Sequence, residues 1–145
     1  MKHEDVYNLS RKHSPPKVNL RDAKIADSYG DESNAERIIL HLKPEDVTRE
    51  DFDYYGWVYP FMDFEDLLYY LYPIAVEFEK DPEMECIDSL LYSLDCVLPF
   101  RKSLLDEADA AAINAALLWI WESGGNDSAD WSGCPNLQEE IGISV

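Results

Sequence analysis

Four aspartates in the middle of the chain are the side chains best suited to metal chemistry. Asp51 and Asp53 form an Asp-x-Asp pair, and Asp63 and Asp66 follow soon after. Their oxygens could hold a hard cation such as Mg²⁺, so a metal-dependent hydrolase using Asp51, Asp53 and Asp63 is one open alternative. The same residues also suit helix starts, because Thr48 with Asp51 is typical of a capping box and Asp63 precedes an apolar periodic run. We therefore expect helix capping and a solvated acidic surface, and no metal site.

The histidines and cysteines have no spacing typical of a metal or catalytic site. They are His3, His13, His41, Cys86, Cys96 and Cys134. Cys86 and Cys96 are too far apart on one predicted helix to share a metal. No local cation would lower a thiol pKa, no nucleophile elbow surrounds a serine, and no Gly-rich loop could cradle phosphate. We predict reduced thiols, no cofactor, and a protein that is not an enzyme.

Aromatic side chains interleaved with carboxylates crowd the segment from Phe52 to Tyr72. One helix face cannot bury all of them, so we expect Phe64 and Trp57 in the core and other tyrosines at a surface. Tyrosines give contact area at little entropic cost, and carboxylates pair with a partner's Lys or Arg. The predicted contact residues are Asp51, Asp53, Tyr54, Tyr55, Glu65, Asp66, Tyr69 and Glu77. A second acidic and aromatic group consists of Glu122, Asp127, Asp130 and Trp131. Simple packing of the tyrosines is the alternative.

The net charge of −18 is concentrated in the middle of the chain. Residues 1–43 carry 8 Lys/Arg against 7 Asp/Glu (+1), residues 44–95 carry 2 against 15 (−13), and residues 96–145 carry 2 against 8 (−6). Such a field repels nucleic acid and anionic membranes and attracts a cationic surface. No apolar run of about 18 residues and no signal-peptide core is present. We expect a cytoplasmic protein with a basic protein partner, or a charge that serves solubility alone.

Helical periodicity predicts the elements that carry these residues. Residues 1–17 are polar and end in Ser14-Pro15-Pro16-Lys17, so we expect a loose arm there. Residues 18–145 are expected to form a single helical domain. Helices are expected over Leu20 to Tyr29, around Ile38 to Leu42, from Thr48 to Gly56, from Asp63 to about Lys80 with a bend at Pro73, and after Asp81-Pro82. The segment from Leu104 to Trp121 is apolar all round in its second half, which is typical of a central buried helix. The fold class is therefore all-α, a compact single-domain bundle of five or six helices.

The stretch from Asp63 to Pro82 resembles a group of small uncharacterised bacterial proteins. It combines an acidic helix start, Tyr69-Tyr70-Leu71 followed by Pro73, and Asp81-Pro82 before a closing helix. In that group the proline more often follows the leucine directly, whereas Tyr72 intervenes here, and the group has no activity to carry over. In size, acidity and its acidic, aromatic middle, the chain resembles more broadly the small immunity proteins that bacteria make against their own cationic nuclease toxins. These include the immunity proteins of contact-dependent growth inhibition systems.

This resemblance implies an immunity protein that neutralises a nuclease-type toxin by covering its basic cleft. Such a cleft must be positive to hold phosphates, so a rigid carboxylate surface can occupy it. One alternative is a nucleic-acid-mimicking inhibitor of a host defence protein, which the same charge would serve. The other is the metal-dependent hydrolase described above.

Overall fold

The described part of the chain consists of helices, turns and extended connections. The computed structural model describes residues 2–144, except for the side chains of residues 125–128. The α-helices are α1 (Glu4–Lys12), α2 (Leu20–Asp27), α3 (Arg49–Tyr55), α4 (Phe64–Lys80), α5 (Ile87–Arg101), α6 (Glu107–Ser128) and α7 (Pro135–Ile141). Short 3-10 turns are η1 (Pro44–Asp46), η2 (Tyr59–Phe61), η3 (Lys102–Leu104) and η4 (Trp131–Gly133). Residues 2–144 contain no β-strand, so the all-α prediction is confirmed, with seven helices where five or six were expected.

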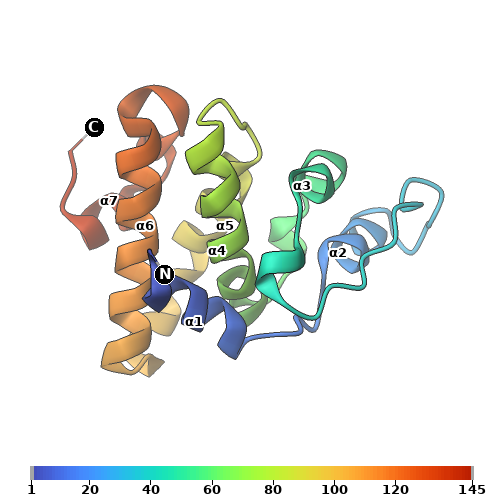
Figure 1. Cartoon of the computed structure of the whole chain (residues 1–145), viewed down its shortest axis with the longest axis horizontal. Coiled ribbons are helices and arrows are strands. Elements are labelled where there is room, and N and C mark those ends of the chain that lie inside the picture. Colours follow the sequence, from blue (N-terminus) through green and yellow to red (C-terminus); the bar gives the residue numbers. More distant parts are fainter. Residues whose placement is uncertain (1, 145) are drawn as a thin grey trace.

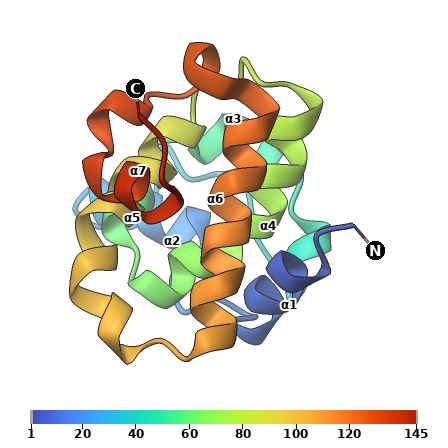
Figure 2. The same cartoon turned by 90° about the vertical axis from the view of Figure 1, so that its left-hand side faces the viewer.

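Helix α4 lies at the centre of the bundle and contacts α1, α5 and α6 (Figures 1 and 2). Its consecutive residues Leu67, Leu68, Tyr69, Tyr70 and Leu71 are all buried, so this part of α4 is packed on more than one face. The prediction that one helix lies at the centre is therefore confirmed, but this helix is α4 and not the segment from Leu104 to Trp121.

Helix α6 covers α4 from one side, so its predicted place at the centre is wrong. Ile113 and Leu117 are buried, whereas Ala108 and Ala111 are exposed, and in the second half Ala115, Leu118 and Trp121 are only partly buried. An exposed alanine costs little, so an alanine-rich helix can look apolar all round in sequence while it buries only one face. No helix within residues 2–144 is long and apolar enough to cross a membrane.

The N-terminal segment is a helix packed on the core, which corrects the prediction of a loose arm over residues 1–17. In α1, Val6 and Leu9 are buried against α4 and α6. The buried Ser10 hydroxyl donates to Leu68 O at 2.9 Å and accepts from Tyr72 N at 3.0 Å. This hydroxyl therefore lies between the Leu68 carbonyl and the Tyr72 N–H, two backbone groups of α4 that bond to each other in a regular helix. Tyr72 directly precedes Pro73, whose missing N–H already removes one backbone hydrogen bond from α4. Residues 13–17 remain outside any helix.

The connection between α2 and η1 is extended over the residues that were expected to form a helix around Ile38 to Leu42. Ile39 is buried, whereas Ile38 and Leu40 on either side of it are exposed. The carbonyl of Arg37 accepts from Tyr55 Oη at 2.6 Å and that of Ile39 accepts from Asn19 Nδ2 at 3.2 Å. These tertiary hydrogen bonds replace the ones that a helix would have formed, so the helix prediction is wrong here.

Candidate functional site

The eight predicted contact residues fall into two groups of four. The buried group is Asp51, Tyr55, Asp66 and Tyr69. The group that reaches solvent is Asp53, Tyr54, Glu65 and Glu77. Buried side chains cannot touch a partner while the fold is intact, so the assignment of the first group as contact residues is wrong. For the second group it remains a prediction.

Three members of the solvent-accessible group already have cations of their own. Glu65 pairs with Arg101, Glu77 with Lys80 at 3.4 Å and Asp53 with Arg49 at 2.8 Å. A partner would have to displace these cations. Glu65 and Glu77 are only partly exposed, whereas Asp53 and Tyr54, both on α3, are exposed and are therefore the more accessible contacts.

Asp51 is a structural carboxylate that ties the extended segment to the start of α3. Its Oδ1 accepts from Arg37 Nε at 2.7 Å and its Oδ2 accepts from Thr48 N at 2.9 Å, and His41 Nε2 lies 2.7 Å from the same Oδ2. Burial by itself raises the pKa of Asp51, but the Thr48 N–H and the Arg37 and His41 side chains outweigh it, so the pKa lies below its ordinary value. The predicted capping box of Thr48 and Asp51 is confirmed. Because both oxygens are engaged, Asp51 is not free for a cation or a partner.

Asp66 ties the segment before α2 to the start of α4 in the same way. Its oxygens accept from Lys17 N at 2.8 Å and from Asp63 N at 3.2 Å. Burial raises the pKa of Asp66, although these N–H groups act against the shift. The capping device predicted at Asp63 is confirmed. Both aspartates therefore hold the fold together.

Tyr55 and Tyr69 belong to the core of the helical bundle. Tyr55 donates its hydroxyl to the backbone of the extended segment, and the Tyr69 ring meets the Tyr70 ring edge-on with centroids 4.8 Å apart. Burial raises the pKa of both Tyr55 and Tyr69, so both phenols stay neutral. The alternative of simple packing holds for these two tyrosines.

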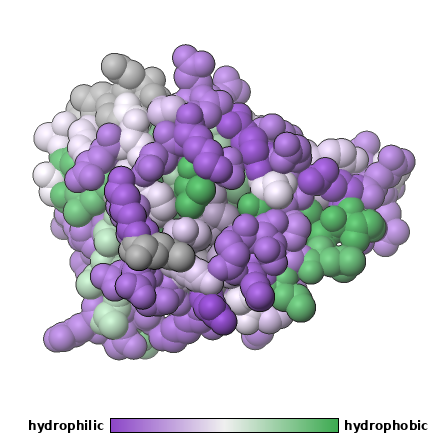
Figure 3. Space-filling view, viewed as in Figure 1, coloured by the Kyte–Doolittle hydropathy of each residue, from purple (hydrophilic) through white to green (hydrophobic). Residues whose placement is uncertain are grey.

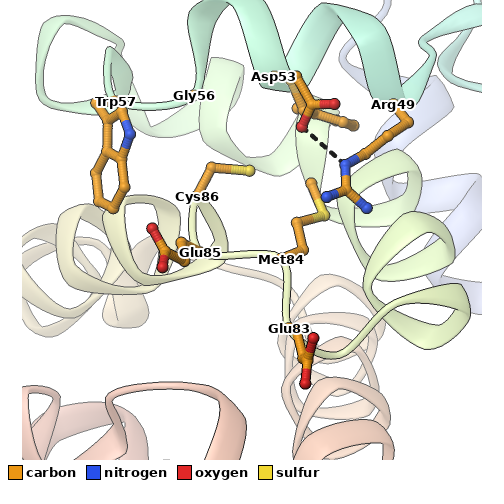
Figure 4. Close-up of a pocket in the computed structure, with 9 residues that line it drawn as sticks. Arg49, Asp53, Gly56, Trp57, Glu83, Met84, Glu85 and Cys86 are labelled. Atoms are coloured by element: carbon orange, nitrogen blue, oxygen red, sulfur yellow. Dashed lines mark hydrogen bonds and ion pairs between the residues drawn. The ribbon is translucent and has the colours of Figure 1, made fainter.

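A hollow of about 310 Å³ lies where the exposed face of α3 meets the connection between α4 and α5 (Figure 4). Its lining residues are Arg49, Phe52, Asp53, Gly56, Trp57, Glu83, Met84, Glu85 and Cys86. In Figure 4, Trp57 and Glu85 lie together on one side, and Asp53 pairs with Arg49 on the other. Trp57 was expected in the core, but it is 61% exposed, so that prediction is wrong.

A close backbone approach at Gly56 shapes this hollow. A Cβ atom at this position would lie 2.7 Å from Cys86 Cβ, so only glycine lets α3 come this near. Met84 and Cys86 are buried, and they hold the connection so that Glu83 and Glu85 extend into solvent. Burial raises the pKa of Cys86 to about 12, so its thiol is neutral and a poor nucleophile.

Arg49 supplies a positive charge to the hollow and is already paired twice. It donates to Asp53 Oδ1 at 2.8 Å and to Asp81 Oδ2 at 3.0 Å. The carboxylates of Glu83 and Glu85 have no ion pair or hydrogen bond with any described side chain. One arginine against Asp53, Glu83 and Glu85 leaves the lining with a net charge of −2.

Helical spacing explains which residues of α3 are exposed. Glu50, Asp53 and Tyr54 are at positions i, i+3 and i+4, which share one face of α3, and Trp57 at i+7 continues this spacing two residues after the helix ends; all four are exposed. This signal was in the sequence and could have placed Trp57 at the surface. Glu83 and Glu85 gave no such signal, because Asp81-Pro82 was expected to begin a helix. Asp81 instead follows the last residue of α4, and α5 starts only at Ile87.

The second acidic and aromatic group, in the C-terminal third, does not form a comparable surface. Trp131 is buried and meets Trp121 edge-on with ring centroids 5.7 Å apart. Asp130 accepts from Ser132 Oγ at 2.7 Å, and the side chain of Asp127 lies outside the described residues. The hollow beside α3 is therefore the stronger candidate.

Within the described residues, no group of three or more His, Cys, Asp or Glu side chains is arranged to hold a metal ion. Of the three aspartates of the hydrolase alternative, Asp51 is engaged by the extended segment and Asp53 by Arg49. Asp63 caps α4. The geometry gives the hydrolase alternative no support.

We expect Mg²⁺, Mn²⁺ and Zn²⁺ at sub-millimolar concentration to leave the melting temperature unchanged within about 1 °C, because only a specifically bound ligand stabilises by mass action. Differential scanning fluorimetry with and without each cation would measure this. An increase of several degrees with one cation, abolished in Asp53→Asn, would revive the hydrolase alternative.

Comparison of the chain with protein-family models, with curated proteins and with solved structures finds no match.

Proposed function

We propose that this protein inhibits a cationic protein in the manner of an immunity protein, and that the hollow beside α3 is the centre of its contact surface. The observation that carries the proposal is an exposed Trp57 beside Glu85, in a hollow that Glu83 also lines, where neither carboxylate has a cation of its own (Figure 4). Large aromatic residues beside a concave surface are typical of binding hot spots.

The chemistry of the hollow suits a lysine or arginine side chain of the partner. Such a cation could stack on the Trp57 indole, which is the best aromatic acceptor for cation–π contact. Glu85 beside Trp57 would then pair with the same cation through charge-assisted hydrogen bonds. An arginine side chain satisfies both demands, because its planar guanidinium stacks and donates at once.

The overall charge of −18 favours a strongly basic partner. Long-range attraction accelerates encounter with a positive cleft, whereas the hollow supplies the short-range contacts that give specificity. A nuclease cleft is positive because it binds phosphates, so a nuclease-type toxin is the partner class that fits best. The nucleic-acid mimic fits less well, because an exposed tryptophan has no counterpart on the phosphate surface of a duplex.

A photo-crosslinking amino acid in place of Trp57, introduced in the native cell, tests this function. We expect one basic protein to be crosslinked and its activity on nucleic acid to be blocked at a 1:1 ratio by the purified inhibitor. The same amino acid at Phe100, which is 82% exposed, is the control and should not give this adduct. An acidic partner, or no adduct specific to position 57, would contradict the proposal.

Reversing the charge of the hollow should slow binding of that partner. In the Glu83→Lys/Glu85→Lys variant we expect the association rate constant to fall by about tenfold and its salt dependence to flatten, because steering depends on exposed charge. Stopped-flow or surface plasmon resonance at several ionic strengths would measure both. Glu107→Lys/Glu139→Lys makes the same charge change on exposed residues of α6 and α7 and should have a much smaller effect. Equal effects of the two variants would mean that only net charge matters.

A further inference from the structure

An extended apolar segment, residues 37–43, runs along the surface of a lobe that projects from the bundle (Figure 1). We define the lobe as residues 17–43. Ile38, Leu40 and Leu42 are 58%, 80% and 67% exposed, whereas Ile39 between them is buried. This alternation is the period of a β-strand. Figure 3 shows the resulting hydrophobic group on the lobe, at the right of the view, surrounded by polar surface.

One edge of this segment is paired with the protein, and the other is open at Ile38 and Leu40, whereas the Leu42 carbonyl on that second edge accepts from the Ser14 hydroxyl. In an extended chain, the N–H and C=O groups of alternate residues point to opposite edges. The carbonyls of Arg37 and Ile39 accept side-chain hydrogen bonds from Tyr55 and Asn19 on the inner edge. The backbone groups of Ile38 and Leu40 have no partner among the described residues. An open edge beside exposed apolar side chains is a template for another strand.

We propose that a second copy of this chain pairs with this edge, so that residues 37–41 of two copies form a two-stranded antiparallel sheet about a two-fold axis. Ile38 of each copy then lies opposite Leu40 of the other, and the two residue pairs exchange four backbone hydrogen bonds. The exposed side chains at positions 38, 40 and 42 of both copies meet on one face and bury one another. The contact is self-complementary, as a two-fold interface requires.

The charge distribution favours a second copy over a basic partner at this edge. Residues 17–43 contain five Lys/Arg and five Asp/Glu, a net charge of zero, so the whole charge of −18 lies outside the lobe. A cationic partner therefore finds no net complementary charge on the lobe itself. Two copies that meet through their projecting lobes keep their acidic bodies apart, and exposed charges are largely screened beyond about 8 Å at physiological salt.

The free monomer already holds this segment in its extended conformation. Asp51 contacts Arg37 and His41 at 2.7 Å each, and Tyr55 and Asn19 hold the carbonyls between them. Pairing then orders little additional backbone, which lowers the entropic cost of association. The contact is small, so a reversible dimer in the micromolar to sub-millimolar range is expected.

Sedimentation equilibrium from about 1 µM to about 1 mM protein tests the proposal. We expect a monomer–dimer equilibrium, and we expect Leu40→Lys to raise its dissociation constant at least about tenfold, because the lysine replaces the apolar side chain that packs against Ile38 of the other copy with a charged one. The control Phe100→Lys changes a side chain of equal exposure, 82% against 80%, outside the lobe and should leave the dimer unchanged. Both variants should keep the wild-type circular dichroism.

Hydrogen exchange of single amides identifies the paired edge. The amides of Ile38 and Leu40 should exchange more slowly at high protein concentration than at low concentration, and this difference should vanish in Leu40→Lys. A monomer at every concentration, a dimer that Leu40→Lys does not weaken, or open-ended oligomers would each overturn the proposal.

Discussion

Replacing Asp51 with alanine should lower the free energy of unfolding by about 2–4 kcal/mol. Two losses add up. The α3 capping box contributes about 1 kcal/mol. Each hydrogen bond to the buried, charged carboxylate contributes about 1.5–3 kcal/mol, less the free energy that the released donors regain when water hydrates them. Arg37 and His41 are partly exposed and can be hydrated once released, which keeps the loss below the upper limit for a broken buried pair. Urea denaturation followed by circular dichroism would measure the difference.

The matched control is Asp53→Ala, two residues further along α3. Asp53 is exposed and pairs with Arg49 at the surface, so its loss should cost about 0.5 kcal/mol or less. Equal losses of unfolding free energy in the two variants would mean that the buried contacts of Asp51 stabilise the fold no more than the surface ion pair of Asp53.

The effect of Asp51 should depend on pH. Its pKa is lowered in the folded protein, so its stabilising effect is present above the ordinary aspartate pKa and disappears as the pH falls through the folded value. The stability gap between wild type and Asp51→Ala should therefore be complete at pH 7 and shrink below about pH 4. A gap that widens on acidification would contradict this assignment.

Local signals in the sequence predicted the helix starts correctly. Thr48 with Asp51, and Asp63 with Asp66, form the expected capping boxes because a cap depends only on residues three positions apart. The helix from Phe64 to Lys80 was equally clear, because its apolar residues recur at helical spacing. These features depend on short-range interactions and can be derived without the fold.

Long-range contacts determine the conformation of the segments that were mispredicted. Residues 4–12 look polar, yet Ser10 finds two backbone partners on α4 that only the folded bundle provides. Residues 38–42 have an apolar run without clear period, and Tyr55 and Asn19 hold them extended. In both cases tertiary hydrogen bonds outweigh weak local propensity.

The candidate site was only half predictable for a related reason. Composition identified the acidic and aromatic middle of the chain, but it could not tell a capping carboxylate such as Asp51 from a surface one such as Asp53. Spacing along α3 separates the two. The contribution of Glu83 and Glu85 to the hollow depends on a turn that is fixed by the close approach of Gly56 to Cys86. No sequence pattern predicts this contact.

Replacing Trp57 with alanine should weaken binding of the cationic partner by about 30-fold or more, which corresponds to about 2 kcal/mol at a hot spot. The loss should appear mainly in the dissociation rate, because the indole makes short-range contacts and carries no charge that could steer encounter. Trp57 is largely exposed in the free protein, so the melting temperature should change little.

The matched control for this prediction is Tyr92→Ala on α5. Tyr92 is 58% exposed against 61% for Trp57, so its truncation removes an aromatic ring of similar exposure outside the hollow. With the partner identified by crosslinking, surface plasmon resonance would give both rate constants for each variant. If Trp57→Ala and Tyr92→Ala bind alike, the hollow is not the contact. If Trp57→Ala slows association and leaves dissociation unchanged, the tryptophan does not act by stacking on a partner cation, and the carboxylates alone would have to account for binding.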